Sequence, residues 1–301
     1  MTAPRDIPMG LVLDMPAETY HAIPAMSAGG LKRMRQSPAH FYGVQLDPNR
    51  PESGEPTAAM KNGTLVHCCI FEPDAVVDRY VVLPSDAPRK PSDAQRNAAK
   101  PSDETKRAIG WWSAFDAAHA GKTIVDPSDM IRARAQAAAV RAMPDVAALL
   151  AEGFGEASAF WIDPDTGELC KCRPDWTSPA GDGVILVDGK TCQDASQEGF
   201  GRAIWNMEYH LQAAWYSDGF EAATGQRVHG FVFAAVESTW PHAAAAYMLG
   251  DDVLDHARRE NRRLLNLYAD CKRTGRWPGY GAGISLISLP AWAQRQLETT
   301  E

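Results

Sequence analysis

The stretch RPDWTSPAGDGVILVDGKT, residues 173–191, decides the fold of this 301-residue chain. Val184-Ile185-Leu186-Val187 is an unbroken apolar run, which is typical of a central strand covered on both faces. Side chains alternate along a strand, so Asp188 and Lys190 point to the same side. Asp175 lies 13 positions before Asp188, and the residues between them allow a hairpin. The sequence therefore predicts two carboxylates and one ammonium group at one end of a sheet.

Two neighbouring carboxylates indicate a cation site, because buried like charges are costly unless an opposite charge compensates them. Oxygen ligands suit Mg²⁺, with Mn²⁺ as a possible substitute. A lysine beside such an ion can orient a water molecule and stabilise the charge that develops in phosphoryl transfer. A surface hairpin with a salt bridge explains the same fragment, since an acid-x-lysine triplet also arises by chance.

Two further features bear on this choice. Gln212 and Tyr216 are four positions apart, so they share one face of a helix and could contact a phosphate or the lysine. The alternative is an amphipathic helix whose polar groups face solvent. His67 is a single histidine in an otherwise apolar helix predicted over 57–71. It is either a metal ligand or a core histidine with satisfied hydrogen bonds.

The rest of the chain predicts one domain over residues 1–301, in which a mixed sheet lies between helices. Residues 1–26 read as an irregular arm, 84–101 as a mobile polar loop and 153–250 as the catalytic sheet core. Strands are expected at 157–163, 168–176, 184–187, 228–236 and 242–249, with a polar loop at 177–183. Helices are expected after the capping residues Ser27, Ser102 and Ser128 and at 195–206, 207–223 and 251–274. The tail from Trp277 to Trp292 is expected to pack against the domain.

Composition excludes several classes of protein. No run of about 18 apolar residues occurs, and Met1 to Met9 do not resemble a signal peptide, so a cytoplasmic protein is expected. The net charge of −8 argues against nucleic-acid binding by bulk electrostatics. The six cysteines do not follow a zinc or iron–sulfur spacing, and they read as reduced thiols. A thiol hydrolase built on Cys192 and His210 has no supporting motif.

The motifs also resemble a known family. Asp175, Asp188-x-Lys190 and Gln212-x-x-x-Tyr216 are similar to the PD-(D/E)XK nuclease motifs of the RecB-like branch. Further stretches, in order along nearly the whole chain, resemble the C-terminal nuclease region of RecE-type exonucleases (exonuclease VIII). These stretches are Tyr20-His21, Ser27, Ser37-Pro38-Ala39-His40, Gly63-Thr64 with His67, Glu72-Pro73, Tyr209-His210-x-Gln212-Ala213-Ala214, Trp277-Pro278-Gly279-Tyr280 and Leu289-Pro290-Ala291-Trp292.

The resemblance implies an α/β fold, with a PD-(D/E)XK-like mixed sheet flanked by helices and helical N-terminal additions. It implies a Mg²⁺-dependent exonuclease that degrades duplex DNA from 5′ ends and leaves 3′ tails for strand annealing. His67, Asp175, Asp188 and the Gly189 carbonyl would hold the metal. Lys190 would assist the nucleophile, supported by Gln212 and Tyr216. The family also implies a ring-like homo-oligomer and a single-strand annealing partner, often phage-encoded.

Two expectations are more specific to this chain. Gly189 stands where the family usually has a larger apolar residue, and a glycine there is expected to loosen the strand. Arg33, Arg35 and Ser37 could bind a terminal 5′-phosphate, or could belong to a solvated helix face. A DNA-end-binding or assembly protein with weak or lost turnover, and a structure-specific endonuclease of the same fold, remain alternatives to the exonuclease.

Overall fold

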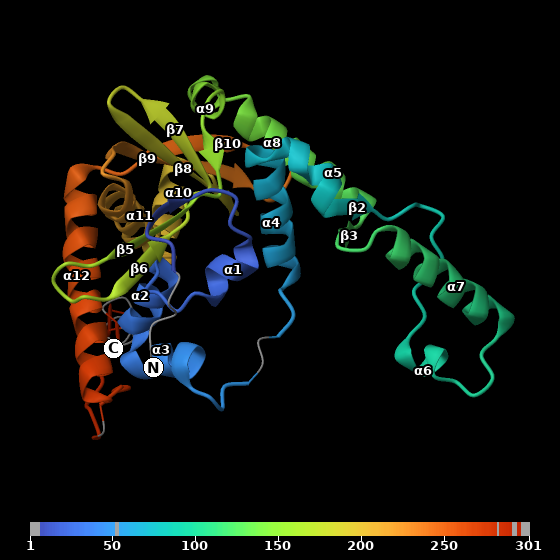
Figure 1. The fold of residues 1–301 in the computed structure, drawn as a ribbon, viewed down its shortest axis with the longest axis horizontal. Coiled ribbons are helices and arrows are strands. Elements are labelled where there is room, and N and C mark those ends of the chain that lie inside the picture. Colours follow the sequence, from blue (N-terminus) through green and yellow to red (C-terminus); the bar gives the residue numbers. More distant parts are fainter. Residues whose placement is uncertain (1–6, 52–53, 282, 291–293, 296–301) are drawn as a thin grey trace.

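The computed structural model describes residues 7–51, 54–281, 283–290 and 294–295. Its centre is a five-stranded mixed sheet in the order β10-β9-β8-β7-β4 (Figure 1). Strands β8 and β9 pair in parallel, whereas the other neighbours in this sheet are antiparallel. The bounds are β4 Phe154–Gly155, β7 Trp176–Ala180, β8 Gly183–Cys192, β9 Arg227–Glu237 and β10 Ala244–Met248.

Helices cover both faces of this sheet, because β8 and β9 direct alternate apolar side chains to opposite sides. Val187, Val232 and Ala234 pack with α4 (Ala58–Phe71), α8 (Pro127–Arg141) and α9 (Pro144–Leu150). Leu186 and Phe233 pack on the other face with α10 (Gln197–Asn206) and α11 (Tyr209–Thr224). The central strand β8 is therefore buried on both sides, as its apolar run predicts.

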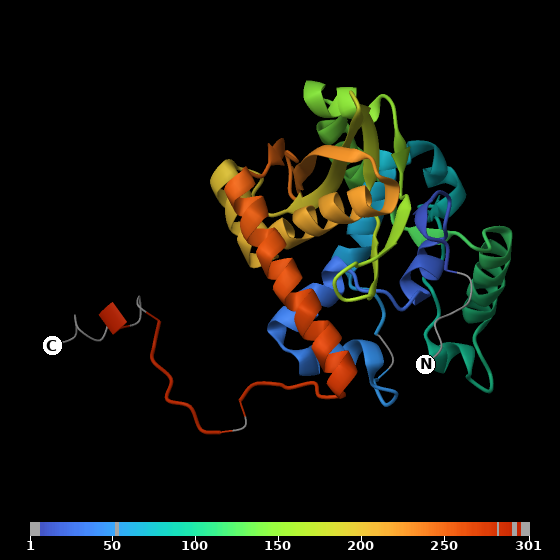
Figure 2. The ribbon, with the colours of Figure 1, turned by 60° about the vertical axis from the view of Figure 1, so that its left-hand side comes forward.

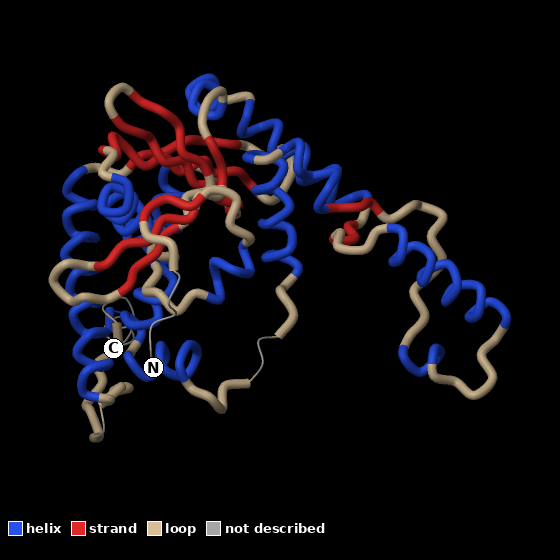
Figure 3. The backbone as a smooth tube through the Cα atoms, viewed as in Figure 1, coloured by secondary structure: helices blue, strands red, loops and turns tan. Residues whose placement is uncertain are grey.

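A second, three-stranded sheet in the order β1-β5-β6 lies beside this layer (Figure 3). Its strands are β1 Gly10–Val12, β5 Ser158–Ile162 and β6 Leu169–Cys172, and its cluster includes residues of α2 (Ala28–Gln36) and α12 (Asp251–Thr274). The buried Lys171 of β6 donates 2.7 Å hydrogen bonds to the carbonyls of Tyr20 and Ile23. These bonds tie the end of α1 (Ala17–Ala22) to the sheet.

Several short elements complete the chain. Residues 80–125 form an extension that projects from the body, with α6 and α7 at its far end (Figure 1). It contains β2 (Tyr80–Val82), α6 (Asp93–Arg96), α7 (Asp103–Ala118) and β3 (Thr123–Val125), and β2 and β3 pair in parallel. The remaining elements are α3 (Pro38–Phe41), η1 (Tyr42–Leu46), η2 (Pro73–Ala75) and α5 (Val76–Arg79).

Most local predictions are confirmed. Ser27, Thr57 and Ser102 accept hydrogen bonds from backbone N–H groups in the first turns of α2, α4 and α7. All six cysteines are free. No helix in the described ranges is long and apolar enough to cross a membrane. The fold class is thus the α/β architecture that the sequence indicates.

Five predictions need correction. The strand expected at 168–176 is two strands of different sheets, and the loop expected at 177–183 is largely β7. Helix α8 begins at Pro127 after Asp126, rather than after Ser128. The arm at 1–26 holds β1 and α1, because its prolines flank these elements, and the 84–101 segment holds α6.

The tail follows its prediction only at the start. Trp277 stacks on Phe41 with ring centroids 5.7 Å apart. Ile284, Leu286 and Ile287 are almost fully exposed, and the segment leads away from the body in Figure 2. Trp292 and residues 1–6 lie outside the described residues.

Candidate active site

Asp188 and Lys190 lie on the same side of β8, as strand alternation requires. Their side chains form an ion pair between Asp188 Oδ2 and Lys190 Nζ, and Asp188 is 1% exposed. Gln212, from the first turn of α11, donates a 2.7 Å hydrogen bond from Nε2 to Asp188 Oδ1. The sequence predicts that the Gln212 amide meets a phosphate or Lys190. In the structure this amide binds the Asp188 carboxylate, which lies between Gln212 and Lys190.

Asp175 reaches the same place from the link between β6 and β7. Its Oδ2 accepts a 2.8 Å hydrogen bond from the Gly189 N–H. The same oxygen lies 3.2 Å from Nδ1 of His67, which comes from α4. Asp175 therefore contacts α4 and the backbone of β8, whereas the side chain of Asp188 faces α11. The structure brings His67, Asp175, Asp188, Lys190 and Gln212 to one end of β8.

The charges of these groups are strongly coupled. Burial and the nearby Asp188 raise the pKa of the Asp175 carboxyl well above its usual value. Burial alone would lower the pKa of the Lys190 ammonium, but the carboxylates of Asp188 and Asp175 raise it. Burial and the charge of Lys190 lower the pKa of His67, so its imidazole is neutral at pH 7. The site thus combines a neutral imidazole, a retained ammonium and two carboxylates that repel each other.

This donor set fits a divalent metal. A raised carboxyl pKa beside a second carboxylate marks a place where a cation would relieve repulsion. Asp188 Oδ2 is buried and faces the ammonium of Lys190, so a divalent cation at this oxygen would share it with Lys190 or take the place of the ammonium. Among the described residues, no three His, Cys, Asp or Glu side chains are arranged as a ready coordination shell. In this arrangement the ammonium of Lys190 balances the negative charge of Asp188.

Tyr216 takes a different position from the one expected. It packs against Phe231, with ring centroids 6.2 Å apart. Burial first, and then the charges of Tyr20 and Asp188, raise the pKa of its phenol. Tyr216 therefore lies near the carboxylates but contributes to packing between α11 and β9.

Tyr209, which belongs to one of the stretches that carry the resemblance, lies near this site, as do Lys32 and Glu156, which no motif singles out. Lys190 Nζ lies 4.8 Å from the centre of the Tyr209 ring, and Lys32 Nζ lies 5.3 Å from the same ring. Glu156 has a left-handed backbone with φ of 54°, and its N–H donates to the Asp175 carbonyl at 3.1 Å. A φ above zero at a non-glycine residue is uncommon and costs energy, so neighbouring contacts must hold Glu156 there.

A cleft of about 1090 Å³ opens on the α4 side of the site. His67 and Glu156 line it, together with Arg173, whose Nε lies 2.5 Å from Glu156 Oε2. Arg173 also donates to the Met15 carbonyl at 2.8 Å, which fixes the guanidinium beside β1. Of the predicted site residues, His67 lines this cleft, and it contacts Asp175 behind it.

Gly189 does not loosen the strand as expected. A Cβ at this position would lie 2.9 Å from Phe71 Cε2 and 3.4 Å from His67 Nε2. The buried Phe71 ring thus occupies the space that a larger residue 189 would need. Glycine here is a consequence of α4 packing closely on β8, and it keeps the Gly189 N–H directed at Asp175.

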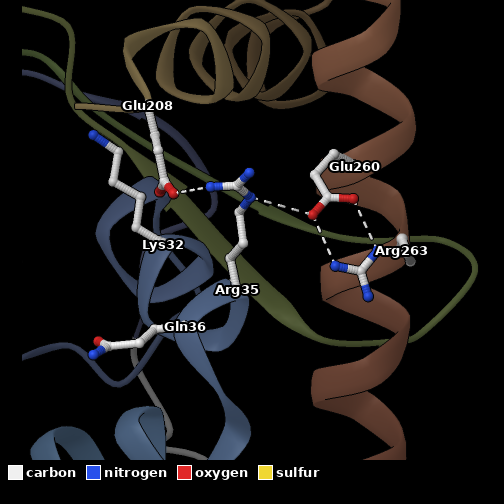
Figure 4. A pocket seen from close by; sticks show the side chains of 6 residues that line it. All are labelled: Lys32, Arg35, Gln36, Glu208, Glu260 and Arg263. Carbon is white, nitrogen blue, oxygen red and sulfur yellow. Dashed lines mark hydrogen bonds and ion pairs between the residues drawn. The ribbon is translucent and has the colours of Figure 1, made fainter. Parts of the chain in front are cut away.

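The three residues predicted to bind a 5′-phosphate have separate roles. Ser37 is buried, caps α3 and lies 2.6 Å from His40 Nδ1. Arg33 donates a long bond to the Gly29 carbonyl at 3.5 Å. Arg35 forms ion pairs with Glu208 and Glu260 and lines a separate cleft (Figure 4). The structure therefore does not assemble these three residues around one anion.

Comparisons with known proteins identify the family and a similar fold. Residues 27–289 match the family described as "PDDEXK-like domain of unknown function (DUF3799)". The fold is similar to a crystal structure described as "Putative exonuclease" from Eubacterium rectale, with a TM-score of 0.52 and 14% identity, over 91% of this chain and 97% of that chain. The structure of SSO0001 aligns with a TM-score of 0.26 and 16% identity, over 38% of this chain and 50% of that one. None of the curated proteins matches.

Proposed function

Because this chain belongs to the family of PDDEXK-like domains of unknown function (DUF3799), we propose that it is a metal-dependent deoxyribonuclease that degrades linear duplex DNA from 5′ ends. The observation that carries the proposal is the cluster at the end of β8. There, buried Asp188 contacts both Lys190 and Gln212, and Asp175 contacts His67. The products would be 3′ single-stranded tails, the substrate of a single-strand annealing protein.

Each residue has a definable role in this proposal. Asp175, Asp188 and neutral His67 would hold the ion, with the Gly189 carbonyl as a further ligand. When bound, Mg²⁺ lowers the pKa of a coordinated water molecule and so supplies the attacking group. Lys190 stays protonated beside its carboxylates, so it donates hydrogen bonds rather than accepting a proton. It would orient the water and stabilise the negative charge that develops on the phosphate.

Gln212 supports this arrangement from α11. Its amide keeps Asp188 Oδ1 occupied at 2.7 Å, which leaves Oδ2 for a cation or for Lys190. Fixing a ligand through a neighbouring hydrogen bond commonly tunes metal affinity. Gln212→Ala should therefore weaken Mg²⁺ binding while leaving all proposed ligands present.

The decisive experiment compares linear 5′-labelled duplex with a closed circle of the same DNA, with and without Mg²⁺. Release of mononucleotides from linear DNA alone supports the exonuclease. Cutting of the circle supports a structure-specific endonuclease instead. Metal-dependent DNA binding without products supports an end-binding protein that has lost turnover.

Three variants assign the roles. Asp188→Asn should lower both Mg²⁺ affinity, measured by calorimetry, and cleavage. Lys190→Ala should bind Mg²⁺ at least as well as the parent, yet lose about 10²-fold or more in cleavage rate, the scale for one transition-state donor. His67→Ala should weaken metal binding most at low Mg²⁺ and recover partly at high Mg²⁺.

The matched control uses an exposed pair, Lys106 and Asp103 of α7, which also forms a lysine–aspartate ion pair. Lys106→Ala and Asp103→Asn should leave cleavage and metal binding unchanged. If Lys190→Ala cleaves linear DNA at the parental rate, the nuclease mechanism based on this lysine is refuted.

A further inference from the structure

A second, open cleft of about 650 Å³ lies between α2, the junction of α10 and α11, and α12. Figure 4 shows the six side chains that line it. Three are cationic and two are carboxylates, which leaves one excess positive charge on a chain whose net charge is −8. The lining residues are Lys32, Arg35, Gln36, Glu208, Glu260 and Arg263.

The arginines of this cleft are held in place by alternating charges. Arg35 lies between Glu208 and Glu260, and Glu260 also binds Arg263 through two 2.8 Å contacts (Figure 4). Such a network limits the motion of both guanidinium groups before any ligand arrives. Side chains that are already ordered lose less entropy when they bind an anion.

Lys32 links the cleft to the active site. Its Nζ donates a 2.7 Å hydrogen bond to the Met207 carbonyl and lies over the Tyr209 ring that also contacts Lys190. The two ring distances place the ammonium groups of Lys32 and Lys190 at most about 10 Å apart, so phosphates of one strand can contact both. Burial and the charge of Lys190 lower the pKa of Lys32, so a bound anion would relieve this repulsion.

An exposed aromatic side chain lies on α10, three residues before Glu208 of the cleft. Trp205, at the end of α10, is 58% exposed, and its ring stacks on buried His210 at 5.3 Å with an interplanar angle of 7°. His256 of α12 lies near both rings, 6.4 Å from Trp205 and 6.3 Å from His210. The Trp205 carbonyl accepts a hydrogen bond from the N–H of Glu208, which lines the cleft. The Trp205 ring is thus stacked on His210, while more than half of the residue stays exposed to solvent.

We propose that this cleft binds a single, unpaired strand of DNA, with a base stacked on Trp205 and backbone phosphates contacting Lys32, Arg35 and Arg263. Aromatic side chains beside a basic groove are the means by which proteins bind single strands without sequence preference. The bases inside a duplex already stack on each other, so Trp205 can accept only an unpaired or terminal base. This inference rests on the proposed function, since the bound strand would be the one that leads to Lys190 and Asp188.

The test measures binding of a fluorescein-labelled single-stranded oligothymidylate of 12 nucleotides by anisotropy, in EDTA so that no cleavage occurs. Trp205→Ala should weaken binding by about 10-fold, the scale of one base–aromatic stack, whereas Trp205→Phe should retain most of the affinity. The matched control is Trp240→Ala, because Trp240 is 83% exposed in the turn between β9 and β10. That control should bind like the parent.

A second pair of variants tests the phosphate contacts. Arg263 and Arg273 lie on α12, and each pairs with a carboxylate three residues earlier. Arg263→Ala should weaken binding several-fold and reduce the slope of log affinity against log salt by about 1, as for one lost phosphate contact. Arg273→Ala should change neither quantity. Circular dichroism of each variant checks that the fold is intact.

The outcomes separate this inference from the proposed function. If a folded Trp205→Ala variant binds the single strand as tightly as the parent, the proposed binding site is overturned, whether or not the protein cleaves DNA. Equal losses in Trp205→Ala and Trp240→Ala, or in Arg263→Ala and Arg273→Ala, overturn it as well. If Trp205-dependent binding is found but the parent does not cleave linear duplex in Mg²⁺, the binding site stands and the nuclease function fails.

Discussion

Replacing Gly189 by alanine adds a single methyl group at the closest contact between α4 and β8. The new Cβ would lie 2.9 Å from Phe71 Cε2 and 3.4 Å from His67 Nε2. Phe71 is buried, and its ring already meets the His67 ring edge-on at 5.9 Å, so the new methyl group would press on both rings. Gly189 has no positive φ, so alanine itself fits the strand backbone.

The size of the effect follows from two opposing terms. Overpacking of a filled core costs about 1–3 kcal/mol. Replacing glycine by alanine in an unstrained conformation returns about 0.4–1 kcal/mol through the unfolded chain. We therefore expect Gly189→Ala to lower the free energy of unfolding by about 1–2 kcal/mol in urea denaturation. Cleavage of linear DNA should fall as well, since His67 would be displaced from Asp175.

A double-mutant cycle with Phe71→Leu tests this reasoning. The smaller side chain creates space, so the two costs should be less than additive by about 1 kcal/mol or more. Gly110→Ala serves as the control, because a Cβ at this position of α7 meets no atom within 4 Å. It should stabilise the protein by about 0.5–1 kcal/mol. Costs for Gly189→Ala and Phe71→Leu that add within about 0.5 kcal/mol would refute the proposed contact.

Four other predictions follow from the structure and the proposed function. Arg262→Met removes the bidentate partner of Asp163, which is 3% exposed. The free energy of unfolding in urea should fall by about 2 kcal/mol, less than for a fully buried pair because Arg262 is 42% exposed. Burial alone would raise the pKa of Asp163, but Arg262 and Thr166 lower it below 3.8. The loss of stability in Arg262→Met should therefore reach its full size above pH 3.8, and it should disappear as the pH falls through the pKa of Asp163 in the folded protein. Lys171→Met leaves the carbonyls of Tyr20 and Ile23 without their donors, and should cost about 1–3 kcal/mol and speed hydrogen exchange in α1. Calcium, which prefers longer bonds and more ligands than Mg²⁺, should permit DNA binding without cleavage, and rapid cleavage in Ca²⁺ would count against the site. Light scattering should give a multiple of 32.8 kDa, because a subunit with net charge −8 needs enclosure to stay on DNA, and a processive monomer would contradict this.

The sequence alone determines the parts of this protein that depend on neighbours in the chain. The apolar run of 184–187 indicates a strand buried on both faces, and the alternation along it places Asp188 and Lys190 together. Ser27 and Ser102 mark helix starts because a capping hydroxyl acts within three residues. The separation of Gln212 and Tyr216 likewise follows from helix geometry.

Only the tertiary structure decides which segments meet. No local pattern shows that residues 168–180 divide between two sheets, because strand partners lie far away in sequence. For the same reason the sequence cannot show that Phe71 fills the space above Gly189, or that Lys32 and Lys190 share the Tyr209 ring. Arg35 looks free on its helix, yet Glu208 and Glu260 bind it from elements more than 170 residues later. Burial, charge coupling and steric room depend on these distant contacts, and the chain sets them only when it packs.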